Sequence, residues 1–119
     1  MQTRLRKFLD VLRLELEDLE GDLSALVEIY KKRLESREIT NYVYLENKSL
    51  LINELHCLAE VVESLNEVDA NRYGTVDAMI DEVQRMITER AQACAFPEVL
   101  TALVTRKIAK VRKYVTQVE

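Results

Sequence analysis

Three side chains in this sequence are of the types that carry out chemistry, namely the imidazole of His56 and the thiols of Cys57 and Cys94. A metal site or an activated nucleophile needs several such groups at short spacing, as in CxxC, HxxxH or ExxH. None of these spacings occurs, and there is no glycine-rich phosphate loop. We therefore expect no metal, no cofactor and no catalytic residue, and we interpret the chain as a non-enzyme.

His56 is the only histidine, and it lies beside the apolar stripe of a predicted helix. An exposed histidine on a helical hairpin is the arrangement with which a phosphotransfer domain works. Such domains usually continue with Leu-Lys-Gly, whereas here the segment CLAE follows at residues 57–60. We expect an ordinary histidine at the edge of the stripe, and a phosphotransfer signalling domain stays an alternative.

The two cysteines form no close-spaced motif, and no export signal or apolar membrane span is visible. Thiols in such a chain are expected to be reduced, which predicts a cytoplasmic location. The net charge of −4 argues against nucleic acid as the main partner. Two glycines and one proline in 119 residues suit long helices, and 48% hydrophobic residues can build the core of one domain.

A leucine ladder near the start of the chain predicts one long helix over residues 3–35. Its members alternate between spacings of four and three: Leu5, Leu9, Leu12, Leu16, Leu19, Leu23, Leu26 and Tyr30. That pattern is a heptad seam, which must lie against other helices. A rod of this length is roughly 50 Å long, so the molecule should be elongated. One hairpin would not cover the whole seam, and we expect part of it to meet a partner or a second copy.

A second periodic run covers residues 39–68, with its clearest stripe at Leu51, Leu55, Leu58, Val62 and Leu65. Leu45 and Ile52 widen the apolar face upstream. Together with the ladder it predicts an antiparallel hairpin over residues 3–68, turning at residues 36–40. The polar segment at residues 66–75 is the clearest break, and Thr75 is a suitable N-cap. Helices over about 75–95 and 97–117 follow, with Pro97 at the start of the last one.

The last predicted helix is basic, because residues 99–119 carry five basic side chains and one acidic one. Its apolar face consists of Leu100, Leu103, Val104, Ile108, Val111 and Val115. These six residues are our predicted partner-binding set, since an aliphatic face suits reversible helix-to-helix exchange. Two alternatives are that the basic face packs against acidic helices of the same chain, and that it meets a membrane surface or nucleic acid.

The hairpin resembles FlgN-type flagellar export chaperones over roughly residues 9–65. The resemblance rests on the Leu pattern that ends in LVEIYKKRLESREI and on the segment YLENKSLLINELHCLAEVVESL, with Leu45, Lys48, Leu50 and Leu51 ahead of the continuing ladder. It implies a cytosolic chaperone that holds late flagellar filament-junction subunits through its C-terminal amphipathic helix. The family often has asparagines before a Leu pair in that helix, and VLTALVTRKIAKVRKYV has none.

These observations predict a single all-α domain over residues 1–119, an elongated antiparallel hairpin followed by two shorter helices. The predicted function is a binding module, most concretely a flagellar or type III secretion export chaperone whose client is an amphipathic helix of another protein. The first alternative is a coiled-coil scaffold or assembly subunit, a homo-oligomer through the long seam. The second is the phosphotransfer domain that uses His56.

Overall fold

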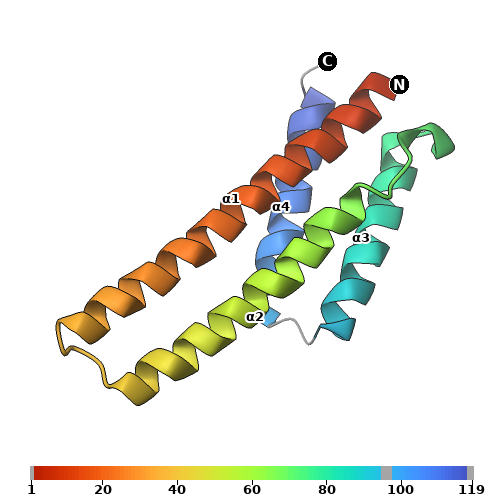
Figure 1. Ribbon diagram of the computed structural model, residues 1–119. Coiled ribbons are helices and arrows are strands. Elements are labelled where there is room, and N and C mark those ends of the chain that lie inside the picture. Colours follow the sequence, from red (N-terminus) through yellow and green to blue (C-terminus); the bar gives the residue numbers. More distant parts are fainter. Residues whose placement is uncertain (1, 95–97, 118–119) are drawn as a thin grey trace.

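The computed structural model describes residues 2–94 and 98–117, and this part of the chain is all-helical. Its elements are α1 (Gln2–Glu35), α2 (Asn41–Leu65), the 3₁₀ helix η1 (Ala70–Arg72), α3 (Val76–Ala93) and α4 (Glu98–Gln117). The molecule measures 55 × 29 × 19 Å, and α1 runs along its whole length (Figure 1). The predicted fold class, an elongated all-α bundle built on a long hairpin, is confirmed.

Helix α1 continues for 34 residues without interruption, as the ladder predicts. Its seam is buried from Leu5 to Leu23, with every ladder member in that stretch at most 8% exposed. The last two ladder positions differ, because Leu26 is 40% exposed and Tyr30 is half-buried. The buried part of the seam therefore ends about two-thirds of the way along the helix.

The turn between α1 and α2 falls where the periodicity lapses, at residues 36–40. Arg37 has a positive φ of 61°, and it ends α1 with two backbone hydrogen bonds. The Glu38 amide donates to the Arg33 carbonyl at 2.9 Å, and the Arg37 amide donates to the Leu34 carbonyl at 3.0 Å. This is the Schellman arrangement, in which a left-handed residue satisfies the last carbonyls of a helix. Thr40 then caps α2, because its hydroxyl accepts from the Val43 amide.

Helices α3 and α4 pack against the same side of the hairpin and cover only the half that holds the N-terminal part of α1 (Figure 1). Helix α3 lies along the second half of α2, and α4 lies along the first half of α1. Thr75 caps α3 as predicted, since its hydroxyl accepts from the Ala78 amide at 3.1 Å. The predicted start of the last helix at Pro97 lies outside the described residues.

The core of the bundle is aliphatic, apart from Phe8. Six apolar residues at helical spacing on α3 are buried: Val76, Met79, Ile80, Val83, Ile87 and Ala91. They meet the seam of α1 and the α2 stripe, in which Leu51, Leu58 and Leu65 are buried while Leu55 and Val62 are half-buried. Leu45 and Ile52, which were expected to widen the apolar face of α2, are 53% and 48% exposed.

The expectation of two reduced thiols is wrong, because Cys57 and Cys94 form a disulfide. Cys57 lies on the face of α2 that packs against α3, and Cys94 caps the C-terminal end of α3. Their Cα atoms are 5.9 Å apart, within the normal range for a disulfide. The bridge fastens the end of α3 to the middle of α2. Disulfides are most common in oxidising compartments, so the bridge does not favour a cytoplasmic location. The cytoplasmic location stays a prediction.

Candidate interaction surface

The basic side of α4 is engaged by acidic residues of the same chain. Glu15 of α1 accepts from Lys107 at 3.0 Å and from Lys110 at 2.7 Å. Hydrogen bonds from Lys110 and Lys107 lower the pKa of the Glu15 carboxyl, because they favour its charged form. Arg112 pairs with Asp77 at the start of α3, at 2.5 Å. Three of the five basic side chains of α4 thus hold the helix to its own bundle, as one of the sequence-based alternatives proposed.

The predicted partner-binding residues lie on the inner face of α4. Five of them are at most 3% exposed, and the sixth is half-buried: Leu100, Val104, Ile108, Val111 and Val115, then Leu103. They form one side of the core opposite α1 and α3. A partner could reach this face only after α4 leaves the bundle, so binding through these residues stays a prediction.

A different apolar surface is exposed on the hairpin beyond the last residue of α3 and the first residue of α4. Helix α3 ends beside Cys57, to which Cys94 is bonded. Counting along antiparallel helices from the Lys107–Glu15 pair, the start of α4 at Glu98 lies level with about residue 24 of α1. Beyond these points the hairpin continues alone to its turn (Figure 1). Residues 24–35 of α1 and 41–56 of α2 therefore have no helix packed on that side within the described chain.

On α1, the side that faces α4 in the covered half carries apolar residues in the uncovered half. Ile29 lies two heptads after Glu15, the residue that pairs with α4. Leu26 lies two heptads after the buried Leu12. Residues separated by multiples of seven share a helix face, with a drift of about 20° per heptad. Leu26 and Ile29, which are 40% and 42% exposed, thus continue the stripe on which α4 packs.

The same rule applies to α2. Val43 and Leu50 precede Cys57 by two heptads and one heptad, and Cys57 marks the side of α2 that faces α3. Val43 is 37% exposed and Leu50 is 58% exposed. The four residues Leu26, Ile29, Val43 and Leu50 therefore lie on one side of the hairpin, in line with α3 and α4. We call this surface the open hairpin face.

Other exposed hydrophobic residues do not belong to the open hairpin face. Leu45 and Ile52 are one heptad apart, and Ile52 lies about 160° around α2 from Leu50 by the helical repeat of 3.6 residues. Leu14 is 60% exposed on the side of α1 that faces away from the seam. Single exposed apolar residues are ordinary in soluble proteins. Ile52 is, however, a suitable control for Leu50, because it is close in sequence and similarly exposed.

Of the three groups singled out for chemistry, Cys57 and Cys94 are joined in the disulfide, and His56 lies on the outer surface. The side chain of His56 is 71% exposed, with Nε2 at 3.5 Å from Glu60 Oε1. No group of three or more His, Cys, Asp or Glu side chains that could hold a metal ion occurs among the residues the structure describes. His56 is accessible to a partner, and its predicted ordinary role stays a prediction.

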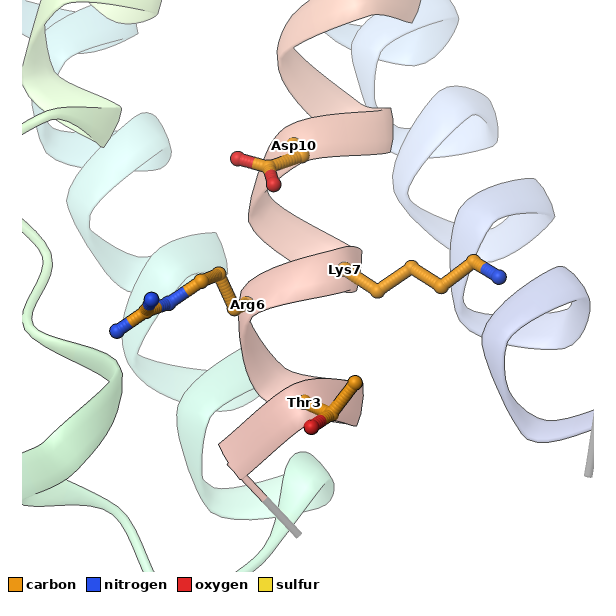
Figure 2. Close-up of a pocket in the computed structure, with 4 residues that line it drawn as sticks. All are labelled: Thr3, Arg6, Lys7 and Asp10. Atoms are coloured by element: carbon orange, nitrogen blue, oxygen red, sulfur yellow. The ribbon is translucent and has the colours of Figure 1, made fainter.

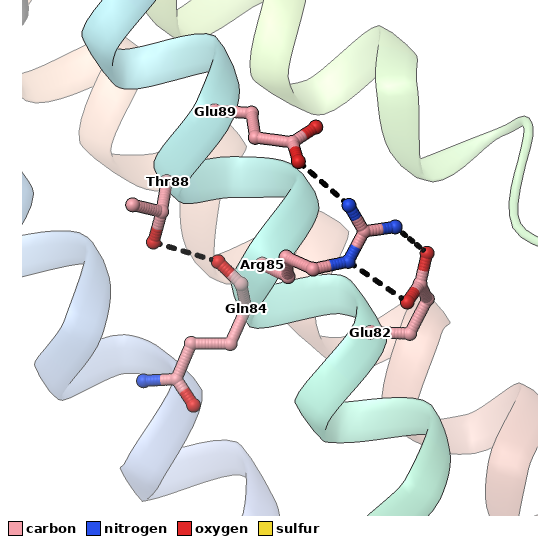
Figure 3. Close-up of polar contacts among 5 residues, drawn as sticks. All are labelled: Glu82, Gln84, Arg85, Thr88 and Glu89. Carbon is pink, nitrogen blue, oxygen red and sulfur yellow. Dashed lines mark hydrogen bonds and ion pairs between the residues drawn. The ribbon is translucent and has the colours of Figure 1, made fainter.

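The polar clusters drawn in Figures 2 and 3 each lie along a single helix and do not enclose a ligand. A hollow near the N-terminus is lined by Thr3, Arg6, Lys7 and Asp10 of α1 alone. Figure 2 shows the side chains of Arg6 and Lys7 extending to opposite sides of that helix. The Lys7 amine lies 5.4 Å from the centre of the Tyr114 ring.

The second cluster lies on the outer side of α3, where Arg85 bridges Glu82 and Glu89 (Figure 3). The hydrogen bond from Arg85 lowers the pKa of the Glu82 carboxyl, and it raises that of the guanidinium. Thr88 donates to the Gln84 carbonyl one turn earlier. Bridges of this kind between exposed residues of one helix support the helix weakly and carry no site.

Comparison with protein-family models, with curated proteins and with solved structures finds no match for this chain. None of the described helices is both long and apolar enough to cross a membrane.

The sequence predicted that part of the seam would stay uncovered, and Leu26 is a member of the ladder. It did not single out Ile29, Val43 and Leu50, because these residues lie beside the predicted stripes. A usable signal was present in the helix lengths. Helices of 18 and 20 residues cannot cover one of 34 residues, so some part of the hairpin had to remain free of them.

Proposed function

We propose that this chain is a non-enzymatic binding module that holds an amphipathic helix of another protein on its open hairpin face. In its most concrete form the proposal is a flagellar or type III export chaperone, in keeping with the resemblance of residues 9–65 to the FlgN type. The observation that carries it is that Leu26, Ile29, Val43 and Leu50 stay exposed on the side that α3 and α4 cover elsewhere.

The covered half of the molecule suggests how a client would bind. There, α4 places an aliphatic face against the α1 seam and its basic residues on Glu15. A client helix on the open hairpin face would pack on the uncovered part of α1 in the way that α4 packs on its covered part. The free stretch of α1, residues 24–35, is roughly 18 Å long, which suits a helix of about 12 residues. Its apolar residues should recur at spacings of three and four.

The alternative route, in which a client displaces α4, is weaker on this structure. Displacement would expose Val104, Ile108 and Val111 together with the α1 residues they cover, all of them buried. Exposing apolar surface costs about 25 cal/mol per Å². A client that binds the open hairpin face does not incur that cost. The six predicted residues of α4 are accordingly assigned to the core, with exchange as the competing hypothesis.

The test is a calorimetric titration of purified filament-junction subunits from the same organism into the full chain. Two variants separate the surface from its surroundings, Leu50→Glu on the open hairpin face and Ile52→Glu on the other side of α2. We expect Leu50→Glu to weaken binding at least about tenfold, since buried charge at an interface centre is costly. Ile52→Glu should change the affinity less than about twofold.

Two results would contradict the proposal. Absence of binding by the unchanged chain would exclude the chaperone function with these clients. Equal binding by both variants would exclude the open hairpin face and return attention to α4. Because Leu50 is 58% exposed, both variants should keep the circular dichroism spectrum and thermal midpoint of the parent.

A phosphotransfer function is retained as a second candidate only because the His56 side chain is exposed. Incubation with a phosphorylated histidine kinase or receiver domain tests it. Label that disappears in His56→Gln would establish it.

A further inference from the structure

The open hairpin face has the length, direction and charge to pair with a second copy of itself. We propose that, without a client, two copies associate tip to tip, each filling the half-bundle that the other leaves open. The proposal rests on the proposed function only in that the same face would receive the client. Self-pairing would then keep this apolar surface covered until a client competes for it.

The uncovered segment of one copy has the length of the space that the other copy leaves open. The uncovered part of α1, residues 24–35, begins level with the start of α4 and ends at the turn. The space available on one copy is therefore as long as the segment that the other copy offers, roughly 18 Å in each. An antiparallel overlap would bring the turn of each hairpin up to the start of α4 in the other. The bundle would then be continuous along α1, while residues 53–56 of α2 would lie between the partner's turn and the end of α3.

The helix directions in such a dimer match those in the covered half of one molecule. Within one copy α4 runs antiparallel to α1, and α3 runs antiparallel to α2 (Figure 1). A two-fold axis that crosses the hairpin from α1 to α2 turns the second copy end for end. Its α1 then lies antiparallel on α1, in the position of α4, and its α2 lies antiparallel on α2, in the position of α3. The order of neighbours around the bundle is the same in both halves.

The axis also places three of the four residues of the open hairpin face against apolar residues, while Leu26 comes opposite the partner subunit's Lys32. Counting outward from the middle of the turn at residues 36–40, residues 24–35 of α1 are level with residues 41–52 of α2. An axis through the middle of both segments passes near Ile29 on α1 and between Glu46 and Asn47 on α2. Ile29 then meets the partner subunit's Ile29. Val43 comes opposite the partner subunit's Leu50, and Leu50 comes opposite the partner subunit's Val43. An isologous interface requires this reciprocity, because one patch must complement itself.

The net charge of the uncovered half also permits two copies to meet. Residues 24–54 carry five basic and five acidic side chains, so this segment is neutral although the whole chain has a net charge of −4. Its basic members are Lys31, Lys32, Arg33, Arg37 and Lys48, and its acidic members are Glu28, Glu35, Glu38, Glu46 and Glu54. Two copies that meet here are not driven apart by net repulsion, as acidic halves would be.

The contact would be small. Two helices side by side are about 20 Å wide, so the footprint is on the order of 20 by 18 Å. This footprint, roughly 360 Å², is less than half of the area of about 800 Å² that stable specific interfaces bury on each partner. We therefore expect a reversible dimer with a dissociation constant in the micromolar range or weaker. A client could compete with such a dimer.

The test is sedimentation equilibrium of the full chain without any client, from low micromolar to millimolar concentration, combined with small-angle X-ray scattering. We expect a monomer–dimer equilibrium. The dimer should have a maximum dimension of about 90 Å, because two molecules of 55 Å overlap by roughly 18 Å. Leu50→Glu and Ile29→Glu should each weaken the dimer at least tenfold, whereas Ile52→Glu should leave it within twofold of the parent.

Three outcomes would overturn this inference. They are a monomer at every concentration, a dimer no longer than the single molecule, and equal effects of Leu50→Glu and Ile52→Glu. The outcome for the client is read separately, by titrating the chain at a concentration at which it is monomeric. Self-pairing without client binding would refute only the proposed function, and client binding by a strict monomer would refute only the dimer.

Discussion

The two halves of the hairpin are built from the same heptad pattern, yet they have different surroundings. In the covered half, Leu5, Leu12 and Leu16 are completely buried under α3 and α4. In the open half, Leu26 and Ile29 continue the same faces of α1 and are about two-fifths exposed. A heptad seam therefore specifies which side of a helix is apolar, while the lengths of the neighbouring helices decide whether that side becomes core or surface.

The largest expected difference between the halves is in the cost of truncating a leucine. Leu16→Ala should lower the free energy of unfolding by about 2–5 kcal/mol, because it leaves a cavity in a closed core. Leu26→Ala should cost less than about 1 kcal/mol, since that side chain is partly in water already. Urea denaturation of the two variants measures both values. Equal costs would mean that the open half is as enclosed as the covered one.

The disulfide lies at the boundary between the halves, and its loss should affect the covered half. It closes a loop with a sequence separation of 37 residues, for which chain entropy gives about 4 kcal/mol of stabilisation. Denaturation with and without reductant should show a loss of this order. The double variant Cys57→Ser, Cys94→Ser should be insensitive to reductant. Two titratable thiols in the folded protein as purified would contradict the bridge.

The ion pairs of Glu15 offer a smaller, pH-dependent comparison. The folded-state pKa of Glu15 lies below its ordinary value of 4.5, so its pairs with Lys110 and Lys107 stabilise the fold above that pH. This contribution is lost as the pH falls through the lowered pKa. Glu15→Gln should therefore cost about 1 kcal/mol at neutral pH and much less in strong acid, below the lowered pKa.

Thermal denaturation of parent and variant at the two pH values measures this difference. A gap between them that persists in strong acid would show that Glu15 contributes by packing rather than by charge.

The smallest effect concerns the turn at the end of the open half. Arg37 has a φ of 61°, which glycine adopts more readily than other residues. Arg37→Gly should change stability by no more than about 1 kcal/mol, with the strain relieved in the fold opposed by greater freedom of the unfolded chain. Urea denaturation gives the value, and a larger loss would show that the Arg37 side chain contributes contacts of its own.

Much of the fold could be predicted from the sequence because it depends on local spacing. The ladder gave the extent of α1, the lapse at residues 36–40 gave the turn, and Thr75 gave the start of α3. These features are decided by residues within one or two turns of each other.

The features that were missed depend on where distant segments meet. Cys57 and Cys94 become neighbours only because α3 returns along α2 and ends at that level, which their spacing in the sequence does not reveal. Likewise the apolar face of α4 was expected to be available to a partner, and the structure buries it against α1 and α3. Leu50 is apolar in sequence and exposed in the fold because nothing in the described chain reaches it.

The central claim is that this molecule interacts through the open half of its hairpin while α4 stays in the bundle. Hydrogen–deuterium exchange of the full chain, at low and high protein concentration and with a bound client, tests it most directly. Amides in residues 24–35 and 41–52 should gain protection on association, and those of α4 should be unchanged. Faster exchange throughout α4, with no change at the hairpin tip, would contradict the account.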